Sequence, residues 1–149
     1  MANGVFPDRT TLDLALADTV EKEATITRVA AKSIVLPPGQ ALAPATGQLK
    51  IPAAAGDLTI RGVAPHMHTR GKKMEVSLDS GGARECITRV GDWHFHWQGL
   101  STYEKPITMK GGDTLSIECD YDTTMETTTI HSGESTSDEM CINFLYVTK

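Results

Sequence analysis

The chain has 149 residues, 40% hydrophobic and 22% charged, as expected for one folded domain over residues 1–149 rather than a disordered chain. Its net charge of −5 and the lack of any run of five basic residues argue against nucleic acid or an anionic membrane surface as a partner. Because no stretch approaches about 18 consecutive apolar residues, we expect no transmembrane helix.

Short runs of alternating apolar and polar residues recur along the chain, the pattern of strands that bury one face. We expect strands at Leu12–Leu16, Leu58–Ile60, Met74–Leu78 and Leu115–Ile117 and a last one at Ile142–Tyr146. Between residues 18 and 31, a short helix over Glu21–Thr27 competes with a strand at Ala24–Thr27, and we favour the strand. The stretch 37–56, rich in Pro, Ala and Gly, predicts a long connection.

Turn-forming residues separate these runs, because glycine reaches positive φ and proline fixes φ. They occur at 37–39, 55–57, 79–82 and 111–113. Short strands divided by such turns predict an all-β fold, an antiparallel β-sandwich of jelly-roll type.

His66 and His68 form a His-X-His pair. On an extended strand, residues i and i+2 face the same side, so both imidazoles can approach one metal ion while Met67 points into the core. The pair is also compatible with two surface histidines that bind nothing. Composition alone would place Met140 among buried packing residues.

A second motif, Ser137-Asp138-Glu139-Met140-Cys141, precedes the expected final strand. Together with His66-Met67-His68 and the pair Cys119 and Cys141, it resembles the second domain of the copper type II, ascorbate-dependent monooxygenases. That family includes peptidylglycine α-hydroxylating monooxygenase and dopamine β-monooxygenase. The resemblance covers residues 62–146, and the Asp-Glu-Met-Cys run is its most specific part.

The resemblance implies that His66, His68 and Met140 hold one catalytic copper ion and that Cys119 and Cys141 form a disulfide. Two imidazoles and a thioether suit Cu(I), whereas methionine is a poor ligand for zinc, the rival metal for a histidine pair. The implied reaction is hydroxylation of a C–H bond in a small organic or peptidyl substrate by dioxygen, with ascorbate as external reductant. A disulfide implies an oxidising compartment, so we expect a secreted or periplasmic protein whose signal peptide is absent from this chain.

The chain departs from the family in its histidines. The full enzymes carry another domain in which three histidines hold an electron-transferring copper, and no histidine precedes His66 here. We therefore expect that domain to be absent, and coupled turnover to need it as a separate partner. Two alternatives stay open: a non-enzymatic copper-binding module for storage, delivery or sensing, and a β-sandwich whose histidines bind no metal.

The segment 92–98 contains a further histidine pair, His94 and His96. If the segment is a strand, both histidines face away from its three aromatic residues. The simpler interpretation places the aromatic side chains in the core and the histidines at the surface. The other interpretation is a second metal site completed by His131. Cys86 has no partner in this scheme, and we expect a free thiol there.

Overall fold

The computed structural model describes residues 7 and 9–149, and its regular structure is almost entirely strand. The elements are β1 (Ala24–Ala30), β2 (Val35–Leu36), β3 (Ala43–Lys50), the 3-10 turn η1 (Ala53–Ala55), β4 (Leu58–His66), β5 (Gly71–Ser80), β6 (Ala83–Val90), β7 (Ser101–Met109), β8 (Thr114–Tyr121), β9 (Ile130–His131) and β10 (Ile142–Thr148). None of the described residues belongs to a helix with the length and apolar character needed to cross a membrane.

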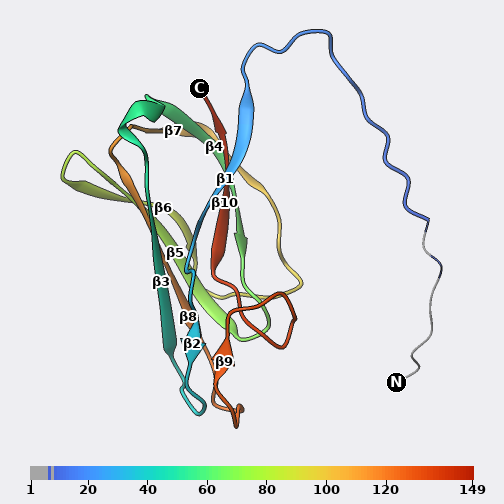
Figure 1. Ribbon diagram of the computed structural model, residues 1–149, viewed down its shortest axis with the longest axis vertical. Helices are drawn as coiled ribbons and strands as arrows, with labels where there is room; N and C mark the ends of the chain where they lie inside the picture. Colours follow the sequence, from blue (N-terminus) through green and yellow to red (C-terminus); the bar gives the residue numbers. More distant parts are fainter. Residues whose placement is uncertain (1–6, 8) are drawn as a thin grey trace.

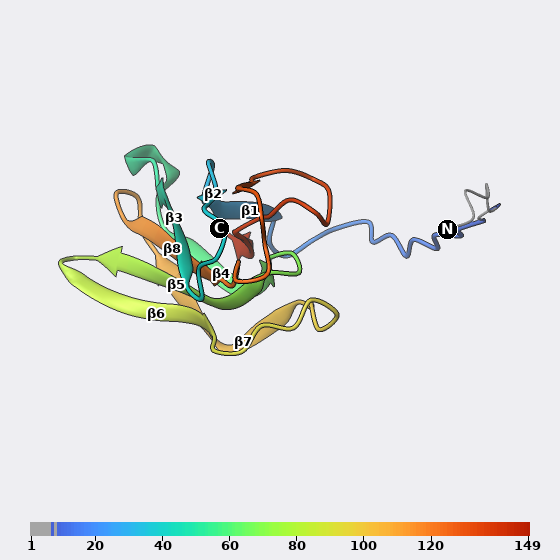
Figure 2. The same cartoon turned by 90° about the horizontal axis from the view of Figure 1, so that it is seen from below.

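Two four-stranded antiparallel sheets make the body of the molecule (Figures 1 and 2). Their strand orders are β1-β10-β4-β7 and β3-β8-β5-β6, and β2 pairs separately with β9. The chain passes repeatedly from one sheet to the other, so that strands distant in sequence become neighbours. This order of the eight long strands is that of a jelly roll, which confirms the predicted fold class.

The core lies between the two sheets, and along several strands every second residue points into it. Along β10, for example, Asn143, Leu145 and Val147 are buried, while Ile142 and Phe144 lie on the outer face and are only half-buried. The strands expected at β4, β5, β8 and β10 are confirmed, as is the strand at β1. The outer face of the β1-β10-β4-β7 sheet is the one that carries the candidate site.

A disulfide joins Cys119 on β8 to Cys141 at the entry to β10, with 5.9 Å between the Cα atoms. It links the two sheets and confirms the pairing that the family resemblance implied. In the chain-entropy treatment, closing a loop of 22 residues stabilises the fold by about 3 kcal/mol. Cys86 is an exposed free thiol, as expected.

Two expectations about strands were wrong. Residues 9–23 contain no strand, and the side chains of Leu12, Leu14 and Leu16 are 78%, 71% and 89% exposed. This segment runs away from the sandwich (Figure 1), so its backbone has no neighbouring strand to pair with. Conversely, the expected connection at 37–56 contains β3, an edge strand that tolerates Pro44 because its outer side needs no ladder hydrogen bond.

Candidate metal centre

The His-X-His pair lies where β4 ends. His66 is the last residue of the strand and is half-buried, while His68 is 4% exposed and Met67 is fully buried in the core, as predicted. The two imidazole rings approach edge to face, with centroids 5.2 Å apart. Two imidazoles this close together can both approach one metal ion.

Hydrogen bonds determine which nitrogen of each ring is free. The Nδ1 atom of His66 lies 2.6 Å from the Oε1 atom of Gln98, and the Nδ1 atom of His68 lies 3.0 Å from the carbonyl oxygen of Asp138. The amide nitrogen of Gln98 donates to the Phe95 carbonyl at 2.6 Å, which fixes the amide oxygen toward His66. Both partners are acceptors, so each Nδ1 carries the proton and each Nε2 keeps a lone pair for a metal.

The segment 91–100 forms a loop around the histidines rather than the expected strand. Trp93 is 7% exposed and donates its indole N–H to the His68 carbonyl at 3.0 Å, and the Phe95 ring lies 6.5 Å from the His68 ring. Trp97, expected in the core, is 87% exposed. Gly71 is required beneath this loop, because a Cβ there would lie 2.8 Å from the Trp93 ring.

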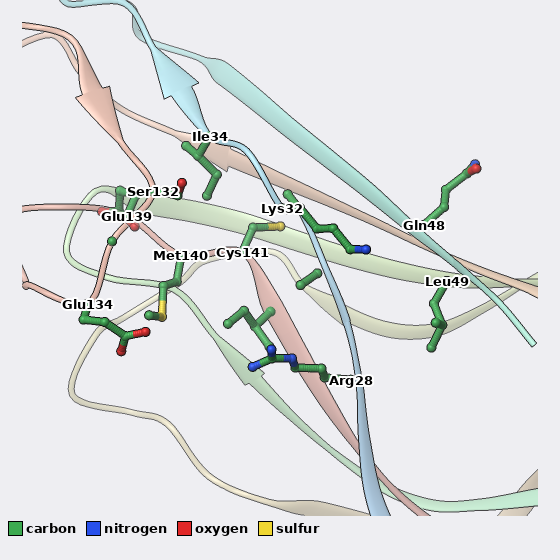
Figure 3. A pocket seen from close by; sticks show the side chains of 14 residues that line it. Arg28, Lys32, Ile34, Gln48, Leu49, Ser132, Glu134, Glu139, Met140 and Cys141 are labelled. Carbon is green, nitrogen blue, oxygen red and sulfur yellow. The ribbon is translucent and has the colours of Figure 1, made fainter.

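Met140 enters the site from the neighbouring strand. Ile142 of β10 pairs with His66 of β4, and Met140 lies two residues earlier, on the same side of an extended chain. The Tyr121 hydroxyl donates to the Met140 carbonyl at 2.7 Å. Figure 3 shows the side chains of Met140 and Cys141 leaving the chain in opposite directions, with the thioether in a cavity of about 460 Å³.

Glu139 connects the two ligand-bearing segments. Its fully buried carboxylate accepts the backbone N–H groups of His68 at 2.9 Å and of Arg70 at 2.7 Å. Burial raises the pKa of Glu139, although these two N–H groups and nearby positive charge oppose that change. Arg70 forms an ion pair with Glu126 at 2.6 Å. Glu139 therefore anchors the turn after His68 to the residue that precedes Met140.

The second group of histidines is less compact. His94 and His96 are both exposed and their ring centroids are 5.6 Å apart, whereas His131 lies on β9. Among the described residues, no group of three or more His, Cys, Asp and Glu side chains is arranged to hold a metal ion. These three histidines are therefore not gathered into such a group.

The chain is similar to known proteins over most of its length. The family model described as copper type II ascorbate-dependent monooxygenase, C-terminal domain, matches residues 22–148. The chain belongs to this family. Tyramine beta-hydroxylase of Caenorhabditis briggsae is 32% identical over 82 residues, 54% of this chain and 14% of that protein. Dopamine beta-hydroxylase of Rattus norvegicus is 29% identical over 82 residues, 54% of this chain and 13% of that protein. Putative DBH-like monooxygenase protein 2 of Homo sapiens is 29% identical over 91 residues, 60% of this chain and 18% of that protein.

The range matched by the family model contains all three candidate ligands, His66, His68 and Met140. The aligned region spans 13–18% of the length of these three relatives. Sequence reasoning missed Gln98, Glu139 and Tyr121 as residues that orient the candidate ligands. Glu139 lies inside the Ser137–Cys141 motif, next to Asp138, and nothing in the sequence marks it as the acid that is buried. Gln98 and Tyr121 carried none, since their roles depend on contacts across the fold.

Proposed function

We propose that the Nε2 atoms of His66 and His68 and the thioether of Met140 bind one copper ion, and that this domain hydroxylates an organic C–H bond. Dioxygen would be the co-substrate and ascorbate the external reductant. The observation that carries the proposal is the pair of adjacent imidazoles whose Nδ1 atoms are both engaged by acceptors. Borderline nitrogen and soft sulfur donors together favour Cu(I) over zinc.

Each surrounding residue has a definable task in this proposal. Gln98 and the Asp138 carbonyl accept the Nδ1 protons, so that in the neutral rings the Nε2 lone pairs are left for the ion. Glu139 fixes the distance between the histidine turn and the Met140 segment. A copper ion held there would supply one-electron redox chemistry for the activation of dioxygen. His66 and Met140 are only half-buried, so the site is open to small molecules from the outer face of the sheet.

Copper stoichiometry tests the ligand assignment. Anaerobic titration of the full chain with Cu(I) against a chromophoric competitor should give one tightly bound ion. The double variant His66→Ala/His68→Ala should lose that ion, while the matched control His94→Ala/His96→Ala should retain it. Two bound ions, or loss of the ion in the control variant, would contradict the assignment.

A non-enzymatic copper-binding module is the second candidate. The described residues offer no group of three His, Cys, Asp and Glu side chains for a second ion, and hydroxylation by dioxygen consumes two electrons from the reductant. We propose that a separate electron-transfer copper domain supplies the other electron. Oxygen uptake, peroxide and product should be measured together, with peptidyl and phenethylamine substrates. Copper binding without hydroxylated product, even with such a domain added, would favour storage, delivery or sensing.

The disulfide bears on location. Bonds such as Cys119–Cys141 persist in oxidising compartments, so we propose that the domain works in a secreted or periplasmic setting. Expression with and without export to the periplasm tests this: the exported protein should carry the bond and the cytosolic protein should lack it. Full oxidation of the cytosolic protein would remove the argument for an exported location.

A further inference from the structure

Residues 9–23, called the arm below, leave the sandwich at the start of β1 and lead away from it in both views (Figures 1 and 2). Leu12, Leu14 and Leu16 lie in the arm and are largely exposed. Their spacing would put all three side chains on one face of an extended strand. An exposed apolar stripe of this kind is typical of a surface that binds another protein.

An apolar cavity of about 380 Å³ lies next to the point where the arm joins β1. The strands β1 and β3 touch where Ala30 faces Gly47, since a Cβ added to Gly47 would lie 2.1 Å from the Ala30 carbonyl oxygen. The cavity lies beyond this contact, between the first half of β1 and the end of β3. Its lining includes the core residues Ile51, Met109 and Val147, so the core is open to apolar side chains from outside.

β1 offers a free backbone edge at this cavity. It pairs with β10 on one side and is the outermost strand of its sheet, so among the described residues its other edge has no strand partner. Ala24, Thr25 and Thr27 of β1 line the cavity. A short strand added to that edge would pair its free N–H and C=O groups and could direct one row of side chains into the cavity.

The direction of the arm decides which molecule it can reach. Because the arm leads away from its own sandwich, its leucines in this conformation can enter only the cavity of another molecule (Figure 1). A second copy carries the same cavity and the same free edge, and two arms exchanged between two copies make a closed pair with two-fold symmetry. Asp13 is the one charged residue of the run 12–16, and the charged residues that line the cavity are one acid, Glu23, and one base, Lys149.

We propose that Leu12–Leu16 of one chain adds as a strand to the free edge of β1 in a second copy. The side chains of Leu12, Leu14 and Leu16 then fill the cavity between β1 and β3 of that copy. The exchange is reciprocal and makes the domain a dimer. It involves neither copper nor the candidate ligands, so its outcome is independent of the proposed function.

Sedimentation equilibrium of the metal-free chain, from micromolar to millimolar concentration, tests the exchange. Every sample carries Cys86→Ser, because the exposed thiol can otherwise join two chains covalently. We expect a dimer. The variant Leu12→Asp/Leu14→Asp/Leu16→Asp should raise its dissociation constant about a hundredfold or more, since three leucine side chains lose their apolar contacts.

Two further variants separate the arm from the cavity. The matched control Thr11→Asp/Ala15→Asp/Ala17→Asp adds three acidic groups to the other face of the arm and should dimerise like its parent. Thr25→Arg places a long charged side chain at the wall of the cavity and should weaken the dimer although both arms are intact. Mixed with the leucine variant in equal amounts, Thr25→Arg should form a mixed dimer, since one intact arm then meets one intact cavity.

An isotope-filtered NOE experiment on a mixture of labelled and unlabelled chains locates the arm. We expect contacts from the methyl groups of Leu12, Leu14 and Leu16 in one chain to Ile51 and Met109 in the other. Three results would overturn the proposal: a monomer at every concentration, a dimer that the leucine variant forms as well as the control does, or such contacts only within one chain.

Discussion

Replacement of Glu139 tests how the two ligand-bearing segments are held together. Its buried carboxylate accepts backbone N–H groups of His68 and Arg70, so Glu139→Gln keeps the shape but turns one acceptor oxygen into a donor. One hydrogen bond to a charged group is then lost, and one buried N–H faces an amide N–H. Because the raised pKa of Glu139 shows that burying its charge is itself unfavourable, part of this loss is offset. We expect the free energy of unfolding to fall by about 1–3 kcal/mol.

Glu139→Ala should cost more, about 3–5 kcal/mol, because both N–H groups lose their acceptor and a cavity forms. Urea unfolding of the metal-free chain measures both variants, and Glu134→Gln, an exposed acid in the same loop, is the matched control. The role of Glu139 in positioning the ligands is measured separately, through the affinity for Cu(I). At a urea concentration where all variants are folded, Glu139→Gln should bind Cu(I) more weakly than the Glu134→Gln control does. Stability and Cu(I) affinity both unchanged in Glu139→Gln would refute the reasoning.

Three further predictions concern neighbouring contacts. Tyr121→Phe removes the hydroxyl that donates to the Met140 carbonyl and should lower the free energy of unfolding by about 1 kcal/mol in urea titrations, with no change expected in the disulfide. Gln98→Leu leaves the Nδ1 atom of His66 without its acceptor and should weaken Cu(I) affinity about tenfold or more in competitor titrations; an unchanged affinity would show that the amide does not orient the ring. Thiol labelling of the denatured, unreduced protein should modify one cysteine per chain, Cys86, whereas three modified cysteines would rule out the disulfide.

Most of the fold followed from local pattern. The alternation at Met74–Leu78 and Leu115–Ile117 reports a half-buried strand directly, because the period of two belongs to the strand itself. The same alternation at Leu12–Leu16 led to a wrong prediction of a strand. A strand also needs a neighbouring strand with which its backbone can form hydrogen bonds, and the pattern of the sequence does not show whether one is present. β3 was missed because its inward residues, Ala43 and Ala45, are too small to stand out and Pro44 reads as a break.

The candidate site was likewise predicted only in part from the sequence. His66, His68 and Met140 were named from a short motif and a family resemblance. The residues that orient them were not, because Gln98 and Tyr121 reach the site from a loop and from the opposite sheet. Contacts across the fold therefore decided what the motif could not.

The X-ray absorption spectrum of the Cu(I)-loaded chain is the most direct test of the central claim. The arrangement of two Nε2 donors and the Met140 thioether predicts a sulfur scatterer together with imidazole scattering, at one copper per chain. In Met140→Leu, a change that keeps the volume of the side chain, the sulfur contribution should vanish while the imidazole signal persists. A spectrum of the unchanged chain with only nitrogen and oxygen scatterers, or a sulfur signal that survives in Met140→Leu, would contradict the account.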